Sequence, residues 1–211
     1  MTQPIFPIAD LHTILPELFI CGAAFALLMA DLFIDAKRRA LIHFLAIAVL
    51  IAAAMITIRD MAVLSTTAFS GMFVRDLIAD VLKIAVYCVT AFSFIYAKPY
   101  LQERGLFKSE FYVLCLFAVL GMMLMISAGN LTVLYLGLEL VALSSYGLVG
   151  MDRDNPIASE AAMKYFVLGA IASGLLLYGM SMLYGATGSL QLESIYAAAS
   201  QTESPYMFHL G

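Results

Sequence analysis

A glutamate lies near the middle of a long apolar segment, where its carboxyl group could carry a proton. Glu139 stands within Leu131–Val149, a segment that holds no basic residue. Desolvation favours the neutral acid and a nearby cation favours the carboxylate, so a glutamate between these influences can exchange a proton near neutral pH. Tyr135 and Tyr146 share its helical stripe and could support it. This pattern favours a proton relay, and the alternative is a static interhelical contact.

A lysine is the second candidate for proton chemistry. Lys164 lies near the start of another apolar segment, and Glu160 precedes it by four residues, the favourable order for a helical ion pair. A lysine at that depth can belong to a functional path, or it can extend its ammonium group to the membrane surface. Its position alone leaves both interpretations open.

Asp80 and Lys83 form a third pair of candidates inside an apolar segment. They are three residues apart, so they can pair on one face of a helix and make that helix cheaper to insert into a membrane. The pattern predicts mainly a structural role for Asp80 and Lys83, with a supporting role in proton movement as the alternative.

These residues must be positioned by membrane-spanning helices. Of the 211 residues, 63% are hydrophobic and only 12% are charged, whereas soluble domains have about 25% charged residues. The mean hydropathy is +0.95. A span needs about 20 mostly apolar residues, and the sequence predicts an all-α integral membrane protein with about six helices: Leu15–Ile34, Ala40–Ile58, Leu77–Tyr96, Phe111–Ser127, Leu131–Val149 and Ala161–Tyr184.

The connecting loops predict an orientation in the membrane. The loops on one side hold seven basic residues: Lys37, Arg38, Arg39, Lys98, Arg104, Lys108 and Arg153. The loops on the other side hold only Arg59 and Arg75. Since Lys and Arg collect on the cytoplasmic side, we expect a multi-pass protein of the cell inner membrane with a periplasmic N-terminus. The first apolar segment lacks a preceding basic residue, so it is not expected to be a signal peptide.

Composition and motifs exclude several other functions. The net charge of −4 offers no basic surface for nucleic acid. Cys21, Cys88 and Cys115 form no CxxC or Cys/His cluster, and the three histidines lack ligand partners, so no metal site is expected. Nucleotide-binding, hydrolase and haem motifs are also missing from the sequence. We expect no cofactor and no redox centre in this chain.

Three runs resemble one family of respiratory membrane subunits. They are LGLELVALSSYGLVG at 136–150, EAAMKYFVLGAIASGLLLYGMSMLYGATGSL at 160–190 and LPELFICGAAFALLMADLF at 15–33. Together they resemble the antiporter-like membrane subunits of bacterial respiratory complex I, the proton-translocating NADH:quinone oxidoreductase, and the run 160–190 is most similar to subunit N.

The resemblance implies a fold and a mechanism. Members of the family contain two inverted repeats of five helices and conduct protons along a central axis of glutamate and lysines. By the match, Glu139 is the glutamate that tunes a partnering lysine, and Lys164 lines the proton path. The family also implies partners, namely the other membrane subunits of complex I and the lipid bilayer. NADH, FMN, iron–sulfur clusters and quinone would bind other subunits.

The sequence departs from the family in one respect. Residues 1–211 form a single expected membrane domain, which corresponds to the N-terminal portion of an inverted-repeat bundle and is expected to be incomplete at its C-terminus. Two alternatives therefore stay open. One is a structural scaffold subunit without its own proton path, and the other is a subunit of a cation/proton antiporter.

Overall fold

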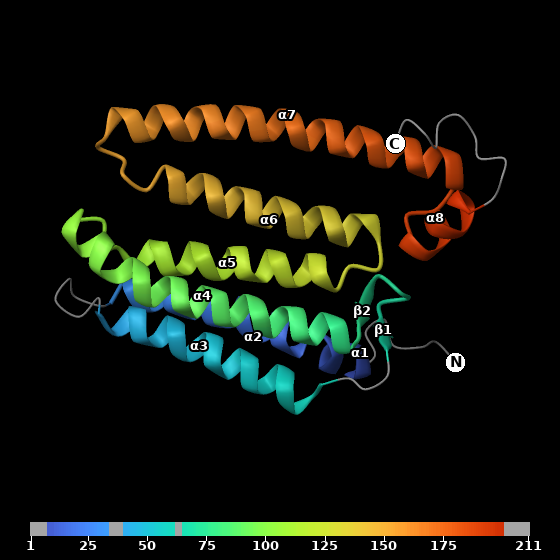
Figure 1. Cartoon of the computed structure of the whole chain (residues 1–211), viewed down its shortest axis with the longest axis horizontal. Helices are drawn as coiled ribbons and strands as arrows, with labels where there is room; N and C mark the ends of the chain where they lie inside the picture. Colours follow the sequence, from blue (N-terminus) through green and yellow to red (C-terminus); the bar gives the residue numbers. More distant parts are fainter. Residues whose placement is uncertain (1–7, 34–39, 62–64, 201–211) are drawn as a thin grey trace.

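The computed structural model describes residues 8–33, 40–61 and 65–200, and its helices pack side by side in a layered bundle. Figure 1 shows α4 (Leu77–Glu103), α5 (Ser109–Ile126), α6 (Leu131–Val149) and α7 (Pro156–Thr187) in succession. The helices α2 (Leu15–Asp31) and α3 (Ala40–Arg59) pack against α5 and α4. The predicted all-α membrane architecture is confirmed in this part of the chain.

Short elements gather at one end of the bundle. The helix α1 (Ile8–Thr13) precedes α2, and the strands β1 (Thr66–Ala68) and β2 (Phe73–Arg75) form an antiparallel hairpin between α3 and α4. The helix α8 (Leu192–Ala199) follows α7 at the same end (Figure 1). The sequence analysis did not predict the hairpin or α8. The hairpin bonds to the α5–α6 turn, where the Val74 amide donates to the Ser127 carbonyl at 2.8 Å.

Five described helices are long and apolar enough to cross a membrane: α3 from Leu41, α4, α5, α6 and α7. The remaining expected span, Leu15–Ile34, corresponds to α2. This helix forms where predicted but has 17 residues. Such a helix is about 26 Å long, shorter than the hydrocarbon core of about 30 Å. The expected end of that span, Ile34, lies outside the described residues, as do Lys37, Arg38 and Arg39 of the orientation argument.

The helix boundaries follow from local capping. Asn130 accepts the Thr132 amide at 2.7 Å and caps the start of α6, and both ends of this helix lie where the sequence predicts. The helix α7 begins five residues earlier than expected because Asn155 accepts the Ile157 amide and Pro156 suits a first helical turn. The helix α4 continues through Pro99 to Glu103, beyond the expected end at Tyr96.

The core of the bundle lies among α2, α3, α4 and α5. Ile20, Leu50, Tyr87 and Leu116 represent these four helices, and each is at most 1% exposed. By contrast, none of the residues of α7 is buried. The helix α6 packs closely against α5, since a Cβ at Gly121 of α5 would lie 2.6 Å from the Gly137 carbonyl oxygen, and Leu140 of α6 packs against the core. The two helix backbones therefore meet at two glycines.

Candidate functional site

Glu139 lies in a chain of polar side chains between α6 and α7. The Ser173 hydroxyl of α7 donates a hydrogen bond to Glu139 Oε1. The Tyr135 hydroxyl lies 2.9 Å from the same Ser173 Oγ. All three side chains are half-buried. The structure therefore brings two of the expected residues, Glu139 and Tyr135, together through Ser173 of α7.

Helix geometry explains this arrangement. Tyr135 and Glu139 are one turn apart on α6, so both face the same side. The loop after α6 reverses the chain, and α7 returns antiparallel along that side (Figure 1). A hydroxyl group can donate and accept at once. Ser173 can therefore connect the phenol to the carboxyl group.

Tyr146 packs against α7 farther along the same stripe. Its ring meets the rings of Tyr165 and Phe166 edge to face, with centroids 4.9 and 5.6 Å away. A Cβ at Gly169 would overlap the Tyr146 hydroxyl, so the glycine makes room for this ring. Tyr146 thus fixes the contact between α6 and α7 at a distance from the Ser173 hydrogen bond.

Lys164 lies away from Glu139. Its Nζ pairs with Glu160 Oε1 at 2.6 Å on the same helix, and the two side chains are 70% and 65% exposed. Nine residues separate Lys164 from Ser173, which is about 13 Å along α7. The pair matches the local contact that the spacing allowed.

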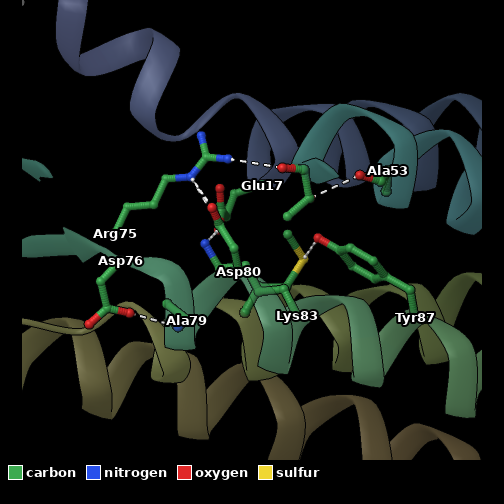
Figure 2. A network of polar contacts seen from close by, with 10 residues as sticks. Glu17, Ala53, Arg75, Asp76, Ala79, Asp80, Lys83 and Tyr87 are labelled. Carbon is green, nitrogen blue, oxygen red and sulfur yellow. Dashed lines mark hydrogen bonds and ion pairs between the residues drawn. The ribbon is translucent and has the colours of Figure 1, made fainter. Parts of the chain in front are cut away.

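A second group of charges lies near the hairpin, and we call Glu17, Arg75, Asp80 and Lys83 the buried ion cluster (Figure 2). Lys83 Nζ lies 2.6 Å from Glu17 Oε1, and Arg75 Nε lies 2.9 Å from Asp80 Oδ1. Each of the four side chains is at most 4% exposed. Asp80 and Lys83, which the spacing predicted to pair with each other, take the ion-pair partners Arg75 and Glu17 from other elements.

Packing explains this exchange of partners. The strand β2 ends beside the start of α4, so Arg75 reaches Asp80 from outside the helix. Arg75 Nη2 also donates to the Thr57 carbonyl of α3 at 3.4 Å. Glu17, in the first turn of α2, faces Lys83 across the core. Glu17 and Arg75 are the charged residues that sequence reasoning missed. The only signal was a carboxylate at the start of an apolar helix.

Metal-binding clusters are not found among the residues that the structure describes. No group of three or more His, Cys, Asp or Glu side chains there could hold a metal ion. The three cysteines are free thiols.

Comparison with known proteins defines the class. Residues 128–211 match the family described as NADH:quinone oxidoreductase/Mrp antiporter, TM. This segment contains Glu139, Lys164 and Ser173. With its apolar helices, the chain is a multi-pass membrane protein, and residues 128–211 are similar to this transmembrane family.

The particular protein to which the chain is similar is NADH-quinone oxidoreductase subunit N. The chain is 52% identical over 190 residues to that subunit of Thioalkalivibrio sulfidiphilus, a match that covers 90% of this chain and 40% of the relative. It is 46% identical over 209 residues to that of Alkalilimnicola ehrlichii, covering 99% and 43%. The resemblance predicted from the sequence is confirmed. The chain spans about 40% of the length of the curated relatives it matches.

Solved structures share the fold. A chain of respiratory complex I from Thermus thermophilus matches with a TM-score of 0.71 and 25% identity, over 92% of this chain and 40% of that one. A chain of the membrane-bound sulfane sulfur reductase, an archaeal respiratory membrane complex, matches with a TM-score of 0.74 and 19% identity, over 95% and 42%. The second match concerns the fold alone.

Proposed function

We propose that this chain forms part of a proton-translocating membrane subunit of NADH:quinone oxidoreductase. In this proposal, Glu139 binds and releases a proton that passes along the hydroxyl groups of Ser173 and Tyr135. The observation that carries it is the hydrogen-bonded chain between α6 and α7. The similarity to subunit N supports it.

The chemistry of the three side chains suits this role. A carboxyl group inside an apolar helix is costly unless it faces polar groups, and such residues commonly mark ion pathways. Serine and tyrosine hydroxyls each have a proton to donate and lone pairs to accept one. A proton leaving Glu139 therefore has an adjacent acceptor in Ser173, and Tyr135 lies next in line.

Lys164 is the proposed cationic partner farther along the path. In the structure it faces outward near the start of α7 and is neutralised by Glu160. We infer that it acts at the cytoplasmic end of this path. Its ammonium group would then receive or deliver protons at the membrane surface.

The proposal also places the chain in a complex and a membrane. The other membrane subunits of complex I would be its partners. NADH, FMN, the iron–sulfur clusters and quinone would bind elsewhere in the complex. The distribution of Lys and Arg supports insertion in the inner membrane with a periplasmic N-terminus, so that the hairpin and α8 face the periplasm.

Replacing the glutamate in the assembled complex tests the proposal. We expect Glu139→Gln to lower NADH-driven proton pumping into membrane vesicles, because the amide cannot exchange a proton. Glu139→Asp keeps an acid on the same stripe and should have a milder effect. A pH-sensitive dye reports pumping while NADH oxidation is followed in parallel. Pumping that stays unchanged with glutamine would contradict the role of Glu139.

The scaffold alternative is supported by the close contact between Gly121 of α5 and Gly137 of α6, because this contact serves helix packing. A scaffold subunit would tolerate Glu139→Gln with full pumping. It would lose assembly when a bulky residue replaces Gly169, where Tyr146 leaves no room for a side chain.

The antiporter alternative is supported by the family description, which also names the Mrp antiporter. The driving force separates this alternative from the main proposal. Proton movement that follows NADH oxidation supports the complex I assignment, whereas movement driven only by an imposed sodium gradient supports the antiporter.

A further inference from the structure

The two ion pairs of the buried ion cluster differ in how their charges are satisfied. Asp80 accepts from Arg75 Nε at both carboxylate oxygens, at 2.9 and 3.2 Å. Arg75 donates in addition to the Thr57 carbonyl. Arginine does not give up its proton in proteins. Arg75 and Asp80 therefore form a permanent, hydrogen-bonded ion pair.

The Glu17–Lys83 pair is close but poorly satisfied. Lys83 Nζ and Glu17 Oε1 are 2.6 Å apart, yet the groups are not aligned for a hydrogen bond. Neither Glu17 oxygen, nor the Lys83 nitrogen, has a hydrogen-bond partner among the described residues. The ammonium group also faces the Phe73 ring, whose centroid is 5.1 Å away. The two buried charges are therefore close to each other but lack the hydrogen bonds that satisfy the Arg75–Asp80 pair.

Such a pair has a low-charge alternative. The Lys83 ammonium can transfer a proton to the Glu17 carboxylate, which leaves a neutral amine and a neutral carboxylic acid. The transfer breaks one N–H bond, forms one O–H bond and leaves the total charge unchanged. It removes the desolvation cost of two ions in an apolar interior, which Coulomb attraction repays only with good geometry and further hydrogen bonds. Lysine, unlike arginine, can lose its proton in this way when buried.

The surroundings of Glu17 leave space for the carboxyl group to change state. A cavity of about 460 Å³ borders Glu17, and its walls include Leu120 of α5 and Leu136 of α6. Leu136 is three residues before Glu139. The other polar groups nearby are already engaged, since the Tyr87 hydroxyl donates to Met123 Sδ at 3.4 Å and Arg75 holds Asp80.

We propose that Glu17 and Lys83 form a second proton-exchanging site, which switches between an ion pair and a neutral acid–amine pair as the complex turns over. The Arg75–Asp80 pair beside it is a fixed structural contact. This inference rests on the proposed function, because turnover supplies the charge changes to which the pair responds.

Infrared difference spectroscopy of the whole complex tests this switch directly. Spectra recorded between the oxidised and NADH-reduced states show the carbonyl stretch of any carboxylic acid that gains or loses a proton. We expect one such band to disappear in Glu17→Gln and to persist in Asp80→Asn. A complex whose acid bands are all unchanged by Glu17→Gln would overturn the inference.

Double variants that remove both charges of a pair separate loss of proton exchange from loss of assembly. Glu17→Gln leaves the Lys83 charge buried alone, whereas the double variant Glu17→Leu/Lys83→Met removes both charges. Arg75→Met/Asp80→Leu is the matched control in the same cluster. We expect only the first double variant to lose the acid band and pump fewer protons per NADH. Equal pumping and unchanged bands in both double variants would show that both pairs are structural.

The infrared band and the pumping test report on different hypotheses. Full pumping in Glu139→Gln would contradict the proposed function. The Glu17 infrared band would still show whether the second site exchanges a proton. Lost pumping in Glu139→Gln without any Glu17 band would overturn only the second site.

Discussion

The two groups of ionisable residues in this chain are stabilised in opposite ways. The buried ion cluster holds two acids and two bases in the core of α2, α3 and α4, with every side chain at most 4% exposed. Glu139 instead lies half-buried at the junction of α6 and α7, where the Ser173 hydroxyl donates a hydrogen bond to it and Tyr135 contacts Ser173. The charged groups are held by ion pairs in the first region, whereas a neutral hydroxyl group holds the carboxyl group in the second.

The sharpest way to break this comparison is to remove one charge from the permanent pair. Asp80→Leu leaves the Arg75 guanidinium buried without its carboxylate. Breaking a buried ion pair from one side costs about 3 to 5 kcal/mol, so we expect little assembled complex on native gels. Arg75→Met/Asp80→Leu should restore much of the assembly. A single variant that assembles as well as the double variant would contradict the importance of charge balance here.

The glycine contact between α5 and α6 is expected to give the next largest effect. Gly137→Ala places a Cβ 2.7 Å from the Gly121 carbonyl oxygen, so the helices must separate. Overpacking of this kind costs about 1 to 3 kcal/mol, which should appear as a lower melting temperature of the purified complex. Gly174→Ala is the matched control, since nothing lies within 4 Å of its added Cβ. Equal melting temperatures would show that α5 and α6 can adjust.

Removing the Ser173 hydroxyl sharpens the comparison at the Glu139 side. Ser173→Ala takes away the donor to Glu139 and the link to Tyr135. A hydrogen bond to a charged group is worth about 1.5 to 3 kcal/mol, so the pumping rate should fall about tenfold or more while NADH oxidation and assembly change less.

Ser144→Ala is the matched control for Ser173→Ala. The Ser144 hydroxyl donates to the Leu140 carbonyl within its own helix α6, at 2.7 Å. We expect normal pumping from this variant. A loss of pumping of the same size in both variants would show that the Ser173 hydroxyl has no specific role.

The sequence specified local features of the molecule better than its long-range pairs. The boundaries of α6 were predicted because the apolar run defines them locally. The stripe with Tyr135 and Glu139 was predicted from helical periodicity. Both are properties of one continuous segment, which a single sequence records directly.

Contacts between segments could not be predicted in the same way. The expected Asp80–Lys83 pair followed from spacing on one helix, but the acid and base take partners from β2 and α2. The contact of Ser173 with Glu139 could not be predicted either, because the register of α7 on α6 depends on the loop between them and on the fit of Tyr146 beside Gly169. The ion-pair partners and the register of α7 on α6 are therefore determined by the packing of the whole bundle.

The smallest effect on stability is expected at Lys164. Its pair with Glu160 is exposed, unlike the ion pairs of the buried ion cluster. Lys164→Gln breaks a contact whose partners are 70% and 65% exposed. Exposed ion pairs contribute about 0 to 1 kcal/mol, so assembly and melting temperature should stay nearly unchanged. A fall in proton pumping in such a stable variant would then report on proton transfer, because lost stability could not explain it. Normal pumping would restrict Lys164 to its surface contact with Glu160.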